Sequence, residues 1–300
     1  YYISGGNDMQ NILNDIECRK DEPMKKHTTF RIGGPARFFY VPKNIEELKL
    51  IIQYCKNEKL KYMIIGNGSN MLFLDEGFDG AVICVGSSMG NINVDNISIY
   101  AEAGALLSKV ASSARDAGLT GMEFAAGIPG TIGGAIVMNA GAYGGEMKDI
   151  VSFVDILEAD GNLRRYSNEE MQFGYRRSIV DADKVVVGVG LKLACGNIDD
   201  INARMDELKT ARVSKQPLEF PSAGSTFKRP EGYFAGKLID DCGLRGYRVG
   251  GAMVSEKHCG FVINYDNATA KDVLKLIDDV KNKVYDEYNV LLEPEVRIVI

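Results

Sequence analysis

The hydroxyl of Ser225 is the first group in this sequence whose surroundings could support chemistry. It lies in the segment Pro-Ser-Ala-Gly-Ser-Thr-Phe-Lys-Arg-Pro at residues 221–230, directly after Ala223 and Gly224. Glycine has no Cβ, so a bulky planar partner could approach the backbone closely here. A type I or II turn with only a structural role is the more common explanation for a Gly-Ser pair. The segment becomes a candidate site only in the company of other suitable residues.

Two glycine-rich segments could bind a phosphate-bearing ligand. Residues 66–70 read Gly-Asn-Gly-Ser-Asn, and residues 127–134 read Gly-Ile-Pro-Gly-Thr-Ile-Gly-Gly. Glycines expose backbone N–H groups that can surround phosphate oxygens, and Ser69, Asn70 and Thr131 could add further donors. Neither segment has the spacing of a Rossmann or P-loop motif, and turns chosen for backbone geometry alone are the alternative. Two such loops in one chain favour a phosphate-bearing ligand.

The charge balance requires any anionic ligand to find local positive charge. The net charge is −6 and the pI is about 5.2, which argues against a nucleic-acid partner because such surfaces are normally basic. Two carboxylates, Glu293 and Glu295, lie near the C-terminus. The positive candidates are Arg176, Arg177, Lys215, Lys228, Arg229 and Arg245.

The composition is that of an ordinary soluble globular protein. Hydrophobic residues make up 45% and charged residues 25% of 300, a length for which two or three domains are expected. The six cysteines form no CxxC pair and no zinc spacing, which predicts reduced thiols and no metal site. Residues 124–145 are uncharged, but seven glycines and Pro129 make them a poor membrane helix. No targeting signal is visible, and a cytoplasmic protein is expected.

Helical and strand patterns are mixed without one long alternating series, which predicts the α+β class. Asn44 with Glu47, and Thr269 with Asp272, have the spacing of helix-capping pairs. Gly118 is placed to end a helix over residues 106–117. The other patterns predict a helix near residues 201–213 and strands at 62–65, 81–85, 97–102, 151–157, 185–193 and 295–300.

Six motifs in order along the chain resemble those of one enzyme family. Over nearly the whole chain, from about residue 28 to 300, the sequence is similar to the UDP-N-acetylenolpyruvoylglucosamine reductase family. The run over residues 235–261 fits the shorter branch of that family, which lacks an insertion carrying a substrate-gating tyrosine. The motifs are residues 66–70, 127–134, 139–144 (Asn-Ala-Gly-Ala-Tyr-Gly), 175–176 (Tyr-Arg), 221–230 and 292–297 (Leu-Glu-Pro-Glu-Val-Arg).

The resemblance implies a two-subdomain FAD-binding module of the vanillyl-alcohol-oxidase/PCMH type, followed by a C-terminal α+β substrate domain. The expected bounds are residues 1–82 and 83–213 for the two FAD-binding subdomains and 214–291 for the substrate domain. Residues 292–300 are expected to form a terminal strand that returns to the FAD module and the active site.

The resemblance also implies a reaction. It is the reduction of UDP-N-acetyl-3-O-(1-carboxyvinyl)-glucosamine to UDP-N-acetylmuramate for peptidoglycan, with non-covalent FAD and with NADPH as co-substrate. Hydride would pass from NADPH to N5 of FAD and on to the vinyl β carbon. Ser225 would protonate the α carbon, while Arg176 and Glu295 stabilise the enolate-like intermediate. Glu295, if desolvated, could stay protonated and donate a hydrogen bond, or it could orient Arg176.

Binding residues follow from the same resemblance. Tyr175, Lys215 and Arg229 are the substrate candidates, although Arg229 stands where the longer branch usually has an amide. Taken singly, Arg176 would more often be a salt-bridging arginine and Glu295 a solvated charge at a strand start. The expected FAD contacts are Gly66, Asn67, Gly68, Ser69, Asn70, Gly127, Ile128, Pro129, Gly130, Thr131, Gly133, Ala140 and Gly141.

Two other functions remain open at this point. One is an FAD-dependent oxidase of the same flavin superfamily, which the Ser225 segment and Glu295 disfavour. The other is a nucleotide-sugar binding protein without turnover. In either case the expected partners are small molecules rather than nucleic acid or membrane, and a monomer is expected.

Overall fold

The computed structural model describes residues 15–300, and these fold as two compact units. The chain passes between the units several times, so neither unit is one continuous segment. Both contain helices and strands, which confirms the predicted α+β class. Among the described residues, unit 1 comprises residues 15–20, Phe38–Asn67 and Gly80–Ala211, and unit 2 comprises Asp21–Arg37, Gly68–Asp79 and Arg212–Ile300.

A small sheet leads the chain into the first glycine loop. β3 (Tyr62–Ile65) pairs in parallel with β5 (Phe78–Cys84) and ends where that loop begins. The helix before β3, α2 (Ile45–Asn57), starts as predicted, since the Asn44 side chain accepts the N–H of Glu47 at 2.9 Å. The strand order in the sheet is β1 (Cys18–Pro23), β2 (Pro35–Tyr40), β5 and β3.

The larger sheet of unit 1 is antiparallel throughout. Its central strand has side chains buried on both faces, and two glycines there make room for aromatic rings. A Cβ on Gly188 would lie 2.0 Å from the Tyr100 hydroxyl, and a Cβ on Gly190 would lie 2.2 Å from the Phe153 ring. The strands run in the order β12 (Leu163–Ser167), β11 (Val151–Leu157), β13 (Val185–Lys192), β7 (Ser98–Glu102) and β6 (Ile92–Asp95).

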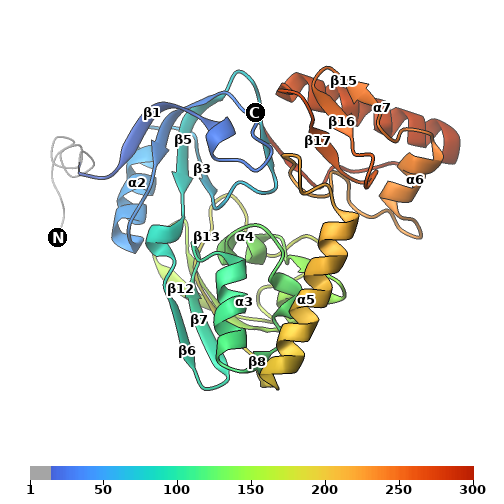
Figure 1. Ribbon diagram of the computed structural model, residues 1–300. Helices are drawn as coiled ribbons and strands as arrows, with labels where there is room; N and C mark the ends of the chain where they lie inside the picture. The colour runs from blue at the N-terminus through green and yellow to red at the C-terminus, as the bar shows by residue number, and fades with distance from the viewer. Residues whose placement is uncertain (1–14) are drawn as a thin grey trace. The chain divides into compact units, whose positions relative to one another are not determined.

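Two helices pack against this sheet (Figure 1). α3 (Leu107–Asp116) ends before Gly118, which has the positive φ of +68° that the sequence predicted for a helix terminator. α4 (Ile132–Val137) begins inside the second glycine segment, so the structure corrects the prediction of a loop across all of residues 127–134. The helix starts there because the Thr131 hydroxyl accepts the N–H of Gly134 at 3.3 Å.

Between the start of the described residues and residue 215, the remaining elements are one long helix and several short elements. α5 (Ile198–Lys215) begins earlier than predicted, because the Asn197 side chain accepts the N–H of Asp199 at 2.8 Å. The short elements are the pairs β8 (Leu119–Thr120) with β14 (Ala194–Cys195) and β9 (Gly141–Ala142) with β10 (Gly145–Glu146), and the 3-10 helices η1 (Met24–Lys26), η2 (Ser87–Met89), η3 (Glu123–Ala125) and η4 (Met147–Asp149).

Unit 2 is built from a three-stranded antiparallel sheet and two helices. α7 (Ala270–Tyr288) begins with the predicted capping box, in which Thr269 and Asp272 each bind the backbone N–H of the other. Its apolar face is fully buried, and it packs on the sheet and on α6 (Ala235–Asp241). The strands run in the order β15 (Arg248–Val249), β16 (Ala252–Val254) and β17 (Val262–Asn264).

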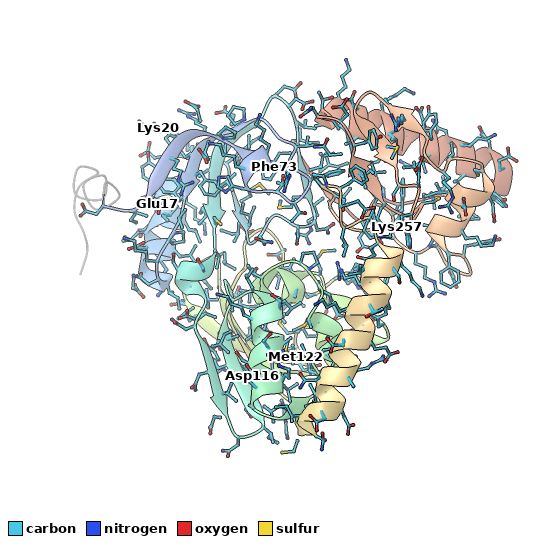
Figure 2. The ribbon with its side chains drawn as sticks, in the orientation of Figure 1. Glu17, Lys20, Phe73, Asp116, Met122 and Lys257 are labelled. Atoms are coloured by element: carbon cyan, nitrogen blue, oxygen red, sulfur yellow. The ribbon has the colours of Figure 1, made fainter. Side chains whose placement is uncertain are left out.

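The C-terminal strand returns to an early part of the chain. β18 (Arg297–Val299) pairs in parallel with β4 (Met71–Phe73), and both strands belong to unit 2. Phe73, which ends β4 and is labelled in Figure 2, is fully buried according to its exposed fraction of 0%. The strand is shorter than the predicted 295–300. The domain bounds expected from the sequence stay predictions.

The start of α7 receives a second cap from the segment after β4. The two carboxylate oxygens of Asp75 accept the N–H groups of Ala270 at 2.9 Å and Lys271 at 3.1 Å. Capping and charge at a helix N-terminus each stabilise by about 1 kcal/mol. We therefore expect Asp75→Ala to lower the free energy of unfolding by about 1–2 kcal/mol in chemical denaturation. Asp278→Ala, an exposed change on the same helix, should alter it by less than about 0.5 kcal/mol. Equal losses would contradict the cap.

Candidate functional site

The two glycine segments meet in unit 1. The chain leaves β3 at Gly66, where an added Cβ would lie only 2.2 Å from Oγ1 of Thr131. Gly130 has a φ of +139°, which residues with a side chain rarely adopt. This conformation leads directly into Thr131, the N-cap of α4. Any larger residue at Gly66 would displace the cap.

Backbone N–H groups at this junction fit an anionic ligand. Among residues 15–300, the N–H groups of Asn67, Gly130 and Thr131 have no protein acceptor. The first N–H groups of α4 are already used, because Ile132 and Gly133 donate to backbone carbonyls at 2.8 and 2.9 Å. Clustered unpaired N–H groups bind phosphate oxygens. The residues present therefore fit a diphosphate held by the two loops rather than by the start of the helix.

Other members of the predicted cofactor set serve packing. A Cβ on Gly133 would lie 2.8 Å from the Cβ of Ala103, and a Cβ on Gly141 would lie 2.6 Å from the Gly145 carbonyl oxygen. Their lack of a side chain is thus required by the fold itself. Of the remaining members in this region, Gly127 and Pro129 are exposed and Ile128 and Ala140 are half-buried.

In unit 2, the end of the first glycine segment binds the C-terminal strand. The Asn70 side chain donates to the backbone carbonyl of Glu295 at 3.1 Å, and the Asn70 carbonyl accepts the N–H of Arg297 at 3.0 Å. Gly68 is buried with φ +57°, and a Cβ on it would lie 2.0 Å from the His27 carbonyl oxygen. Ser69, between them, is half-buried.

Within the segment of residues 221–230, Thr226 next to Ser225 forms hydrogen bonds to two other parts of unit 2. The Thr226 N–H donates to the Gly260 carbonyl at 2.9 Å, and its hydroxyl accepts the N–H of Val262 at 2.9 Å. The Thr226 carbonyl accepts the N–H of Glu295 at 2.8 Å. Thr226 is only 3% exposed, whereas Ser225 is exposed. Unit 2 thus brings Ser225 and Glu295 together on one rigid support.

The loop that supplies Gly260 is itself ordered by His258. Nδ1 of His258 accepts the Gly260 N–H at 3.0 Å, and the ring lies edge-on to Phe261. Burial lowers the pKa of His258, so the ring is neutral at neutral pH and carries its proton on Nε2. The contacts of His258 support the backbone next to Thr226.

Arg176 belongs to unit 1 and lies at the tip of a tight turn. Gly174 and Arg177 exchange two backbone hydrogen bonds of 3.0 and 3.3 Å. Between them, Arg176 has a left-handed φ of +56°, with its guanidinium carbon 5.0 Å from the Tyr175 ring centroid. Such conformations cost roughly 1–3 kcal/mol outside glycine and are concentrated at functional sites. The conformation makes this turn one functional candidate among the ten described non-glycine residues with a positive φ.

A buried asparagine and a carboxylate beside this turn were missed by the sequence analysis. Asn139 is 0% exposed and donates to Glu146 at 2.9 Å and to the Gly174 carbonyl at 3.1 Å. The hydrogen bonds from Lys148 and Asn139, together with the positive charge of Arg176, lower the pKa of Glu146. Glu146 is therefore ionised at neutral pH. The available signals were the motif at residues 139–144, which begins with Asn139, and the polar character of this residue within an apolar Gly/Ala tract.

The predicted substrate residues lie on the surface of their units. Tyr175 is 49% exposed, and Lys215 is the exposed last residue of α5. The Arg229 guanidinium carbon lies 4.0 Å from the centroid of the Phe234 ring, and both residues are exposed. Over residues 15–300 no cluster of three or more His, Cys, Asp or Glu could hold a metal ion. In the same part of the chain, no helix combines the length and apolarity needed to cross a membrane.

Comparison with known proteins agrees with this arrangement. Residues 36–167 match the FAD binding domain family, and residues 216–299 match the C-terminal domain of UDP-N-acetylenolpyruvoylglucosamine reductase. These two matches confirm the predicted order of an FAD-binding module and a C-terminal domain. They also identify FAD as the cofactor of this chain.

Near full-length relatives carry the same name. The enzyme of that name from Clostridioides difficile (strain 630) is 51% identical over 96% of this chain and 95% of its own. The one from Limosilactobacillus reuteri is 46% identical over 97% and 99%. A crystal structure of UDP-N-acetylenolpyruvylglucosamine reductase from Thermus caldophilus superposes with a TM-score of 0.80 at 38% identity, covering 95% and 99% of the two chains. The chain therefore belongs to the UDP-N-acetylenolpyruvoylglucosamine reductase family of FAD-dependent oxidoreductases.

Proposed function

We propose that this protein reduces UDP-N-acetyl-3-O-(1-carboxyvinyl)-glucosamine to UDP-N-acetylmuramate, with NADPH as the electron donor, for peptidoglycan synthesis. The observation that carries the proposal is the support around Ser225. One buried threonine, Thr226, binds the backbone of Glu295 on one side and that of Gly260 and Val262 on the other. When bound, FAD supplies a hydride acceptor and donor that serves NADPH and the vinyl β carbon in turn.

The Ser225 hydroxyl donates the proton in this proposal. Hydride addition to the β carbon drives electron density into the substrate carboxylate, and the α carbon then becomes basic. Serine is a weak acid, so it transfers a proton only to a strongly basic centre held in tight geometry. The hydrogen bonds of Thr226 supply a fixed backbone for that geometry.

Arg176 and Glu295 stabilise the charge that develops on the substrate. The planar guanidinium of Arg176 can bind a carboxylate through two hydrogen bonds. Glu295 either donates a hydrogen bond as a protonated acid or orients Arg176. Hydrogen-bond donors aimed at developing charge typically lower the activation free energy by roughly 3–4 kcal/mol each.

The remaining contacts and partners follow the same proposal. The FAD diphosphate lies at the loop junction of Asn67, Gly130 and Thr131, where the N–H groups have no protein acceptor among the described residues. Tyr175, Lys215 and Arg229 contact the nucleotide-sugar substrate. The protein works as a cytoplasmic monomer on small molecules, without a nucleic-acid partner.

Gly224 offers a test of how closely the ligands approach Ser225. Its φ is +78°, and a Cβ there would meet no protein atom within 4 Å. We expect Gly224→Ala to destabilise the fold by only about 1–2 kcal/mol, the usual cost of a left-handed alanine. The added methyl should raise KM for the enolpyruvyl substrate by about tenfold or more, equivalent to roughly 1.4 kcal/mol. Steady-state kinetics and thermal melting measure the two effects.

Gly232→Ala is the matched control, because Gly232 has φ +74° and also has open space around its added Cβ. It should reproduce the small loss of stability without the change in KM. Equal KM values for the two variants would contradict a ligand next to Gly224.

The proposed reaction is tested with the purified protein and its bound flavin. NADPH should bleach the yellow colour anaerobically, and the enolpyruvyl substrate should restore it with formation of UDP-N-acetylmuramate. Restoration by oxygen but not by the enolpyruvyl substrate would assign an oxidase instead. A protein that binds the nucleotide-sugar but is not bleached by NADPH would be a binding protein without turnover.

A further inference from the structure

Asn139 is a fully buried polar residue whose side chain joins two separate segments of unit 1. It follows Met138, the C-cap of α4, and has a left-handed φ of +40°. Its Nδ2 donates to Oε2 of Glu146 at 2.9 Å and to the carbonyl of Gly174 at 3.1 Å. Its Oδ1 accepts the N–H of Lys148 at 2.9 Å. The carboxamide is therefore fixed in orientation by all three contacts.

The bond to Gly174 is the one that reaches the functional turn. Gly174 is the first residue of the backbone pair that closes the turn around Tyr175 and Arg176. The other side of the turn is tied to the end of α4, since the Ser178 hydroxyl donates to the Val137 carbonyl at 3.2 Å. Both sides of the turn are thus bound to the C-terminal end of α4 or the residue that follows its cap.

The N-terminal end of α4 carries the loop junction. Thr131, its N-cap, lies against Gly66. Six helical residues span roughly 9 Å, at 1.5 Å per residue. α4 is therefore a short rigid spacer with the flavin-binding loops at one end and the Arg176 turn at the other.

The charges around Asn139 favour the same orientation of its side chain. Oε2 of Glu146 also pairs with the Lys148 ammonium at 3.0 Å. An ionised carboxylate accepts a hydrogen bond about twice as strong as a neutral acceptor does. It therefore holds the NH₂ group of Asn139 on the side of Glu146 and Gly174.

We propose that Asn139 is a positioning residue that fixes the Gly174 carbonyl and thereby presents Arg176 to the substrate carboxylate. The inference rests on the proposed function. It assigns to Asn139 an effect on Arg176 and none on the transfer of hydride from NADPH.

The test measures binding selectivity and the two half-reactions in Asn139→Ala. Isothermal titration of the oxidised flavoprotein compares the enolpyruvyl substrate with UDP-N-acetylglucosamine, which lacks the carboxylate. We expect the preference for the carboxylate-bearing ligand to fall about tenfold to a hundredfold, as for a lost hydrogen-bond network to a charged group. Stopped-flow reoxidation by the substrate should slow similarly, while flavin content and reduction by NADPH stay within about threefold.

The double variant Asn139→Asp with Glu146→Gln separates positioning from folding. It exchanges donor and acceptor between positions 139 and 146, so the contact between these two side chains is restored. The melting temperature should therefore exceed that of Asn139→Asp alone, in which two carboxylates would face each other. A carboxylate at position 139 cannot donate to the Gly174 carbonyl, so the selectivity should stay below that of Glu146→Gln alone, which keeps the Gly174 bond and is the reference for the charge lost beside Arg176. Recovery of selectivity in the double variant would overturn the role of the Gly174 bond.

Asn168→Ala is the matched control, because its side chain donates to the carbonyls of Lys148 and Val151 at 2.8 and 2.6 Å in the same region. It should keep the wild-type selectivity. A lower melting temperature with unchanged selectivity in Asn139→Ala would reduce Asn139 to a purely structural residue. Failure of the wild type to be reoxidised by the enolpyruvyl substrate would instead overturn the proposed function.

Discussion

Replacing Ser225 with alanine is expected to slow reoxidation of the reduced flavin by the enolpyruvyl substrate by about 10²–10⁴-fold, the usual contribution of a positioned general acid. Reduction of the flavin by NADPH should be nearly unchanged, because no proton is delivered to the substrate in that half-reaction. Anaerobic stopped-flow spectroscopy follows bleaching and recovery of the flavin separately.

The fold should tolerate this change well. Ser225 is exposed, and the hydrogen bonds that hold the adjacent Thr226 do not use the serine hydroxyl. Surface substitutions of this kind usually alter stability by less than about 0.5 kcal/mol. Ser222→Ala, in the same segment, is the control and should leave both half-reactions at their wild-type rates. Equal slowing of both half-reactions in Ser225→Ala would contradict the proton-donor role.

Helices with clear capping residues were predictable from the sequence. Asn44 and the Thr269–Asp272 pair mark the starts of α2 and α7 where the structure has them. α4 was missed because it has only six residues and includes two glycines, which are poor helix formers. Its stability comes from the Thr131 cap and from burial against the large sheet, and neither is visible in local sequence.

Strands with long apolar runs were also predictable, because the pattern that indicates them lies within the strand itself. β3 and β11 have the expected bounds. β15, β16 and β17 have two or three residues each, which is too short for an alternating pattern to appear. They are specified by pairing with one another and by packing under α7, and both depend on contacts between distant parts of the chain.

The residues of the candidate site also divide into those that sequence motifs reveal and those that only contacts in the structure reveal. The glycine segments, Ser225, Arg176 and Glu295 were named from motifs. The structure adds that Gly66 meets Thr131 in unit 1, and that the Ser225 segment meets Glu295 in unit 2. Asn139 begins the motif at residues 139–144, but nothing in that motif indicates its role, because its partner Gly174 lies 35 residues away. Residues that position others are recognised by their contacts, which the sequence alone does not supply.

Replacing Arg176 with lysine should lower the rate of flavin reoxidation by the substrate about 10²–10³-fold, which corresponds to the loss of one preorganised donor. Lysine keeps the positive charge, but it cannot form the two parallel hydrogen bonds of the guanidinium. Both residues would adopt the same left-handed backbone, with φ +56°, so the melting temperature should not change. NADPH-dependent bleaching should also be retained, since the carboxylate is absent from that step.

Arg177→Lys is the matched control for this prediction, because Arg177 is the exposed neighbour on the same turn. If an arginine fork is needed at one position only, the control should bind and reduce the substrate as the wild type does. The Arg176 variant should also lose most of its preference for the enolpyruvyl substrate over UDP-N-acetylglucosamine, because only the former presents a carboxylate to the fork. Wild-type reoxidation in Arg176→Lys would mean that charge alone suffices there. Loss in both variants would mean that the turn as a whole, rather than the Arg176 guanidinium, supports the reaction.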